Sequence, residues 1–242
     1  MEQLTGILFI DIETVPITEH YASLTERLQH EWVRKAKVIK PAPGHENAEP
    51  ASLFEEKAGV FSEFAKVVCI GLGSLYMADN KWKMRLKSLT GTDEKVLLND
   101  FCTVVSKFNK VHPGMRFCGH NIKEFDIPFL SRRMIINGQA LPECLQLWGK
   151  KPWEVTHIDT MDMWRFGDYK NFTSLSLLAA VLDIPSPKSD IDGSQVSGVF
   201  YKEKDLDRIG RYCLQDVYTS AKVYLRLAGM GNIELEQEIV TE

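Results

Sequence analysis

Two acidic residues close the first apolar segment of the chain, and their spacing suits a metal site. Asp11 and Glu13 end the run GILFIDIE at positions 6–13. If this run is a strand, alternate residues share a face, so the two side chains project together about 7 Å apart along the chain. Carboxylate oxygens suit divalent cations, and buried carboxylates need cations or hydrogen-bond donors to offset their charge. The motif D-x-E is short enough to arise about once by chance, so it needs support from other residues.

A third carboxylate lies in the segment GHNIKEFDIPF, residues 119–129. Asp126 follows a short apolar run and precedes a helical pattern, and one interpretation is that it only caps that helix. The functional interpretation adds the amide of Asn121 and the aromatic faces of Phe125 and Phe129. An amide and aromatic faces beside a carboxylate can hold an unstacked nucleotide.

A tyrosine and a fourth acid occur in the amphipathic segment 206–227. Tyr212 and Asp216 are four residues apart, which puts a phenol and a carboxylate on one face of a helix, a turn apart. The same spacing recurs at Tyr201 and Asp205, but that pair lies just before the expected helix. We therefore favour Tyr212 and Asp216 as the functional pair.

The order and form of these segments resemble a known family. The segments FIDIET, GHNIKEFDIPFL and YCLQDVYTSAKVY resemble the three motifs of the DEDD exonuclease superfamily, in its tyrosine-bearing branch. They are most similar to the proofreading exonuclease domain of B-family DNA polymerases, and the intervening HIDTMDMW, SLSLLAAVLDI and KSDIDGSQV resemble the same domain. The resemblance is weakest over 17–58. A chain of 242 residues leaves no room for polymerase palm and fingers, so we expect a stand-alone 3'-5' exonuclease.

The resemblance implies a fold and a metal site. The fold would be α/β and ribonuclease-H-like, a central five-stranded mixed sheet flanked by helices. Two divalent cations, Mg²⁺ or Mn²⁺, would be bridged by Asp11, with Glu13 and Asp216 on the first and Asp126 supporting the second. Tyr212 would orient the attacking water. Two such ions can activate water and stabilise the departing oxygen of a phosphodiester.

The resemblance also suggests which residues contact substrate. Thr14, Asn121, Phe125 and Phe129 match family positions near the terminal nucleotides, and Lys188 lies where some members place a lysine near the scissile phosphate. The alternatives are a core role for the aromatic residues and a surface role for the lysine. We expect single-stranded DNA 3' ends as substrate. RNA remains open because nothing in the sequence reads the 2'-hydroxyl, and a non-catalytic nucleic-acid-binding or scaffold domain is a third hypothesis.

The elements that must position these residues follow from hydrophobic periodicity. We expect one domain over 1–242, with 17–58 an insertion or flap that either clamps substrate or covers the sheet, and with a solvated acidic tail at 230–242. Within the insertion, we expect regular structure to be broken at Pro41, Pro43, Gly44 and Pro50. The apolar runs 66–75 and 81–89, separated by Ala78, Asp79 and Asn80, predict an antiparallel hairpin whose second strand is the edge of the sheet. The expected strands are 6–12, 66–75, 81–89, 115–118 and 155–159, and the expected helices are 19–37, 93–109, 127–137, 174–182 and 206–227.

Composition limits the possible partners. The net charge of −4, from 29 Lys and Arg against 33 Asp and Glu, argues against a protein that coats duplexes by bulk positive charge. Bound cations at four of those acids would still permit a nuclease with few phosphate contacts. Five cysteines without a C-x-x-C pair predict reduced core thiols rather than a zinc site. Neither a signal peptide nor an apolar run of membrane-spanning length is visible, so we expect a cytoplasmic protein with no membrane contact.

Overall fold

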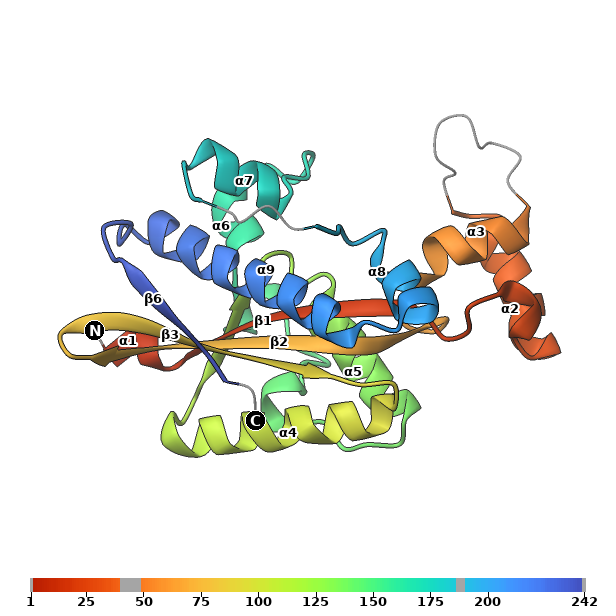
Figure 1. Ribbon diagram of the computed structural model, residues 1–242, viewed down its shortest axis with the longest axis horizontal. Coiled ribbons are helices and arrows are strands. Elements are labelled where there is room, and N and C mark those ends of the chain that lie inside the picture. The colour runs from red at the N-terminus through yellow and green to blue at the C-terminus, as the bar shows by residue number, and fades with distance from the viewer. Residues whose placement is uncertain (1, 40–48, 186–189, 241–242) are drawn as a thin grey trace.

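The computed structural model describes residues 2–39, 49–185 and 190–240. At its centre is one mixed sheet of six strands in the order β5-β4-β1-β2-β3-β6, flanked by helices (Figure 1). Strand β1 pairs antiparallel with β2 and parallel with β4. The strands are β1 (Ile7–Pro16), β2 (Ala65–Ala78), β3 (Lys81–Thr90), β4 (Arg116–Gly119), β5 (Ile158–Asp159) and β6 (Leu235–Ile239). The expected α/β class is confirmed.

Helices cover both faces of this sheet. Helix α9 (Leu206–Leu227) crosses one face, with α6 (Thr160–Arg165) and α7 (Leu175–Val181) on the same side, while α4 (Glu94–Val111) and α5 (Asp126–Ile136) lie on the other (Figure 1). Helix α9 spans the range expected from its periodicity. The remaining helices are α1 (Glu2–Thr5), α2 (Glu26–Ala36), α3 (Pro50–Lys57) and α8 (Val196–Gly198).

The alternation of β1 decides where its acids point. Ile10 and Ile12 pack in the core on the side of α4 and α5, whereas Ile7 and Phe9 pack under α9. Because successive strand residues face opposite sides, Asp11 and Glu13 lie on the α9 face. The expectation that the two carboxylates share one face is met by this pattern.

The expectations of five strands and of β3 as the edge were wrong, and part of the acidic tail is a strand whose acids remain at least partly exposed. Strand β6 pairs in parallel with β3, so β3 is an inner strand. Acids of the tail meet bases of β3: Lys81 Nζ lies 2.5 Å from Glu236, and Arg85 Nη2 lies 3.4 Å from Glu238. The alternating acids that suggest a solvated end are one half of a cross-strand charge pattern, which stabilises neighbouring strands of opposite charge.

The hairpin of β2 and β3 is confirmed, and its turn explains its register. Asp79 and Asn80 both have positive φ, at 52° and 58°. Two central residues in the left-handed region make the turn whose twist matches the flanking strands, and Asp and Asn tolerate that conformation. The two strands pair without interruption from Cys69 opposite Thr90 to Ala78 opposite Lys81.

The described part of the stretch 17–58 has a small core of its own. Helices α2 and α3 pack around Trp32, which is fully buried and donates a 2.7 Å hydrogen bond from Nε1 to the carbonyl of Pro50. Pro50 begins α3, where its missing amide costs nothing, although the sequence suggested that it would break regular structure. Pro41, Pro43 and Gly44, the other expected breakers, lie outside the described residues.

The cysteines of the chain form no disulfides. All five cysteines are free, and Cys69, Cys118 and Cys213 are buried. Within the described residues, none of the helices has both the length and the apolar character needed to cross a bilayer.

Candidate active site

Strand β1 and helix α9 bring the first two carboxylates against a thiol. Ligand atoms of Asp11, Glu13 and Cys213 lie within 4.8 Å of one another. The Sγ of Cys213 lies 3.4 Å from both the carbonyl oxygen and Oδ2 of Asp11 and donates to them. The pairing of β1 with β2 shifts register between Glu13 and Thr14, as at a β-bulge. Such irregularities re-aim side chains next to functional sites.

Asp126 joins this group from the start of α5, beyond the loop that follows β4. It is 3% exposed, and its Oδ1 accepts a 3.0 Å hydrogen bond from the main-chain amide of Ile12. The expected role of Asp126 as N-cap is corrected: Phe125 occupies the cap, and Asp126 is the first residue of α5. Its carboxylate accepts from the amide of Ile12 on strand β1 in addition to its own amide. The positive end of the α5 dipole still favours an anion here.

Tyr212 and Asp216 lie one turn apart on α9, as expected from their spacing. Hydrogen bonding between them lowers the pKa of Asp216 and raises that of Tyr212. The competing pair has structural roles: the hydroxyl of Tyr201 donates to the carbonyl of Pro16 at 2.5 Å, and Asp205 caps α9 by accepting from the amide of Arg208.

Burial raises the pKa of all four carboxyl groups, and repulsion from the other carboxylates adds to the shift at Asp11 and Glu13. The pKa of Asp11 is raised well above its ordinary value by burial first and then by the charges of the other three. Burial, followed by the charges of Asp216 and Asp126, does the same to Glu13. Burial raises the pKa of Asp126 to about 7 and that of Asp216 to about 6. The shifts show that the four groups interact electrostatically across three elements.

The same cluster holds Tyr212 in its neutral form. Burial, and then the charges of Asp216, Glu13 and Asp11, raise the pKa of the phenol far above its ordinary value of 10.0. A phenol with a raised pKa is a hydrogen-bond donor at neutral pH and not a base.

The donor set fits divalent cations. No Lys, Arg or His in the described ranges forms an ion pair with any of the four carboxylates. Four clustered acids without a cationic side chain favour hard cations such as Mg²⁺ and Mn²⁺ as the source of compensating charge. Cys213 adds a thiol at the edge of the cluster that the sequence interpretation assigned only to the core, and burial raises its pKa, so it acts as a donor to Asp11.

Two glycines permit the close approaches that build the site. A Cβ on Gly71 of β2 would lie 2.8 Å from both Cys213 Sγ and Val217 Cγ2, so α9 could not pack this near the sheet. A Cβ on Gly119, at the end of β4, would lie 2.5 Å from the carbonyl oxygen of Ile10. Glycine at these positions lets α9 and the 119–125 loop reach β1.

The 119–125 loop is fixed by an acid that the sequence interpretation did not single out. The carboxylate of Asp159, at the end of β5, accepts from the amides of Asn121 at 2.9 Å and Lys123 at 3.0 Å, and from Met161 at 2.9 Å. Asn121 has a φ of 62°, a conformation that Asn tolerates. Its Oδ1 is buried without a hydrogen-bond partner among the described residues, so an acceptor is left for a ligand. The only sequence signal for Asp159 was its place in HIDTMDMW.

The other expected substrate residues have different surroundings. Phe125 is half-buried and lies against Phe129 with ring centroids 5.4 Å apart. Phe129 is 2% exposed and belongs to the core, so its ring offers no free face. Thr14 donates from Oγ1 to the carbonyl of Gly59 at 2.7 Å. Lys188 lies outside the described residues.

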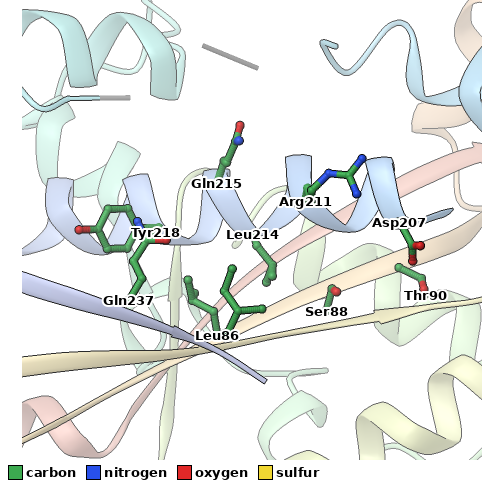
Figure 2. Close-up of a pocket in the computed structure, with 10 residues that line it drawn as sticks. Leu86, Ser88, Thr90, Asp207, Arg211, Leu214, Gln215, Tyr218 and Gln237 are labelled. Atoms are coloured by element: carbon green, nitrogen blue, oxygen red, sulfur yellow. The ribbon is translucent and has the colours of Figure 1, made fainter. Parts of the chain in front are cut away.

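A separate groove of about 450 Å³ lies between α9, β3 and β6. Figure 2 shows Leu214 pointing from α9 toward Leu86, with Ser88 further along β3. None of the four carboxylates lines it, so this groove is distinct from the carboxylate cluster.

A protein-family model matches most of the chain. Residues 61–241 match a family described as "Predicted 3'-5' exonuclease related to the exonuclease domain of PolB". That match contains Asp126, Tyr212 and Asp216, whereas Asp11 and Glu13 precede it. No match was found among curated protein sequences.

The fold is similar to that of a solved polymerase. The family B DNA polymerase from the hyperthermophilic archaeon Pyrobaculum calidifontis superposes with a TM-score of 0.55 at 17% identity. The alignment covers 92% of this chain and 24% of the polymerase, so the chain spans about a quarter of the length of that protein. The similarity confirms the expected ribonuclease-H-like fold. Because the family match covers more than half of the sequence, the chain belongs to the family of predicted 3'-5' exonucleases related to the exonuclease domain of PolB.

Proposed function

We propose that this protein is a metal-dependent 3'-5' exonuclease that removes nucleotides from single-stranded DNA. The observation that carries the proposal is the convergence of Asp11, Glu13, Asp126 and Asp216 from β1, α5 and α9, each with a raised pKa. A protein that only binds nucleic acid gains nothing from four buried or half-buried acids that repel one another and the phosphate. Two divalent cations would offset this charge.

The four carboxylates would hold two Mg²⁺ or Mn²⁺ ions. When bound, such ions supply an activated water and charge stabilisation at the departing 3'-oxygen. The chain keeps the ligands in place: the Ile12 amide fixes Asp126, and the main chain of Asp11 is held by the Cys213 thiol.

Tyr212 has the properties of a water-positioning group. Its raised pKa keeps the hydroxyl proton in place, so the hydroxyl can donate to or orient the attacking water without removing a proton from it. It lies on α9 one turn from Asp216, so any movement of the helix moves both groups together.

The terminal nucleotide would be held by the 119–125 loop and its neighbours. The unpaired Oδ1 of Asn121 can accept a hydrogen bond from a sugar or base. Phe125 offers a ring for stacking, and the buried Phe129 supports that ring from below. Thr14 would contact the substrate backbone from β1, and Lys188 would contact the scissile phosphate.

The test is a 5'-labelled single-stranded oligonucleotide incubated with Mn²⁺ or Mg²⁺. Wild type should produce a ladder that shortens from the 3' end, and EDTA or Asp216→Asn should abolish it. Asp205→Asn is the matched control, because Asn is an equally good N-cap and this residue belongs to the structural Tyr201 pair. A ladder that persists in Asp216→Asn or in excess EDTA would refute the proposal.

Matched DNA and RNA oligonucleotides in the same assay decide the sugar preference. Faster degradation of RNA would replace this proposal with an exoribonuclease. Tight binding without cleavage of either polymer in either metal would establish a non-catalytic binding domain.

A further inference from the structure

The connection between α6 and α7 presents three aromatic rings to solvent. In the segment 166–173, here called the aromatic loop, Phe166 is 89% exposed, Tyr169 76% and Phe172 68%. The residues between these rings, Gly167, Asp168, Lys170 and Asn171, are exposed as well. Exposed apolar rings in a soluble fold usually mark a binding surface. The polar residues between them suit separate flat ligands better than one continuous apolar partner.

Both ends of the aromatic loop are fastened to the 119–125 loop. At its start, the half-buried Arg165 donates from Nη1 to Glu124 at 2.9 Å. At its end, the carbonyl of Thr173 accepts a 2.8 Å hydrogen bond from His120 Nε2. The 119–125 loop leads directly into Asp126. The aromatic loop therefore has a fixed position relative to a catalytic carboxylate.

The conformation of the aromatic loop holds its rings outward. Phe166 ends α6 in the left-handed region with a φ of 45°, and Gly167 follows with a φ of 89°. The guanidinium of Arg165 lies 5.4 Å from the ring centroid of Tyr169 and supports it by a cation–π contact. Asp168 closes the turn by accepting from the amide of Lys170 at 2.9 Å and the side chain of Asn171 at 3.0 Å.

We propose that the aromatic loop is a stacking platform for the single-stranded segment that precedes the 3'-terminal nucleotide. This inference rests on the proposed exonuclease function. Bases of every kind stack on aromatic side chains, so such a platform grips a strand without reading its sequence. The aromatic loop itself carries one acid, Asp168, and one base, Lys170, whose charges cancel. The adjacent Arg165 is paired with Glu124 and Asp162. Stacking rather than phosphate attraction would supply most of the affinity, in keeping with the net charge of −4.

The test measures binding apart from cleavage. Fluorescence anisotropy of a 5'-labelled oligothymidylate of about 12 nucleotides, in EDTA, gives Kd for wild type and for Phe166→Ala, Tyr169→Ala and Phe172→Ala. Each variant should bind about tenfold more weakly, and the triple variant at least about 100-fold, since each lost stack weakens binding by at least several-fold. Melting temperatures should not change because all three side chains are exposed.

The matched control removes exposed aromatic residues elsewhere. Trp148 and Trp153 are 85% and 78% exposed and lie in the connection from α5 to β5. The double variant Trp148→Ala, Trp153→Ala should bind like wild type. An equal loss of affinity in this control would show a general effect of surface aromatic residues and would overturn the platform.

Oligomer length locates the platform. In wild type, affinity should rise from dinucleotides to hexanucleotides as bases reach the aromatic loop, and the triple variant should lose this rise. Variants that bind every length as wild type does would overturn the proposal and assign the rings to a protein partner instead. Binding that depends on the rings in a protein that never cleaves in Mn²⁺ would support the platform and refute the exonuclease.

Discussion

The main-chain amide of Ile12 donates a 3.0 Å hydrogen bond to Oδ1 of Asp126, across 114 residues of sequence. Ile12 stands between Asp11 and Glu13, so the bond ties the third carboxylate to the segment of β1 that carries the first two. The side chain of Ile12 packs in the core on the opposite face. A change that frees Asp126 therefore affects both the geometry of the site and the pairing of a buried amide.

Two substitutions at Asp126 separate these effects. Asp126→Asn keeps an acceptor for the Ile12 amide and removes a buried charge, so the protein should stay folded while activity falls at least about 100-fold. Asp126→Ala leaves the amide buried without a partner, which costs about 1–3 kcal/mol of unfolding free energy. Urea unfolding and the oligonucleotide assay measure the two effects. Equal stability of both variants would mean that the Ile12 bond contributes nothing.

The raised pKa values predict how stability depends on pH without metal. Asp126 titrates at about 7 in the folded protein, against an ordinary value of 3.8, and Asp216 at about 6. Between about pH 4 and pH 7 the folded protein holds protons that the unfolded chain has released. The free energy of unfolding should therefore fall as pH rises through this window, and Asp11 and Glu13, whose pKa values are also raised, add to the fall. Asp126→Asn should reduce this fall, measured by thermal melting in EDTA.

Divalent cations should reverse that loss. Mn²⁺ binds the deprotonated carboxylates, so its stabilising effect should be larger at pH 8 than at pH 5. At about 100 times Kd, the expected gain is about 2.7 kcal/mol, a rise in Tm of about 5–10 °C. An equal shift at both pH values, or the same shift in Asp216→Asn, would place the ions elsewhere.

Tyr212→Phe tests the role of the phenol. The pKa of Tyr212 is raised far above the assay range, so the hydroxyl acts as a neutral hydrogen-bond partner. Loss of a hydrogen bond to a charged group or its water should lower kcat about 10- to 100-fold. The pH–rate profile from about pH 6 to pH 9 should keep its shape. A limb that disappears in the variant would instead identify Tyr212 as a titrating base.

Gly71→Ala tests the close approach of α9 to the sheet. The added methyl would lie 2.8 Å from Cys213 Sγ and Val217 Cγ2, so α9 must shift, at a cost of about 1–3 kcal/mol. Activity should fall because α9 carries Tyr212 and Asp216. Gly6→Ala is the control, since a Cβ there has no atom within 4 Å. Equal stability and activity of the two variants would show that the packing at Gly71 tolerates a methyl group.

Local patterns in the sequence predicted most of the site-bearing elements. The apolar period of 206–227 gave α9 with its bounds, and strand alternation placed Asp11 and Glu13 on one face. The hairpin followed from two apolar runs around Asp79 and Asn80. These features depend on neighbours within a few residues, which is why one sequence was enough to predict them.

Features that depend on distant partners were missed. The acids of β6 pair with Lys81 and Arg85, some 150 residues earlier. Because these partners are distant in sequence, the segment of β6 alone does not indicate a strand. The bond from the amide of Ile12 to Asp126 joins residues 114 positions apart, and nothing near Asp126 in sequence predicts it. The role of Asp159 depends on amides of another loop, and the burial of Phe129 depends on the packing of α5 against the sheet. Sequence periodicity carries no information about such pairings.

Crystals soaked in Mn²⁺ test the central claim most directly, because anomalous scattering locates the metal without reference to activity. We predict two peaks about 3.5–4 Å apart, coordinated by Asp11, Glu13, Asp126 and Asp216, and no peaks in crystals of Asp11→Asn. Absence of manganese from these four carboxylates, in crystals of a protein that still degrades DNA from its 3' end, would contradict that claim.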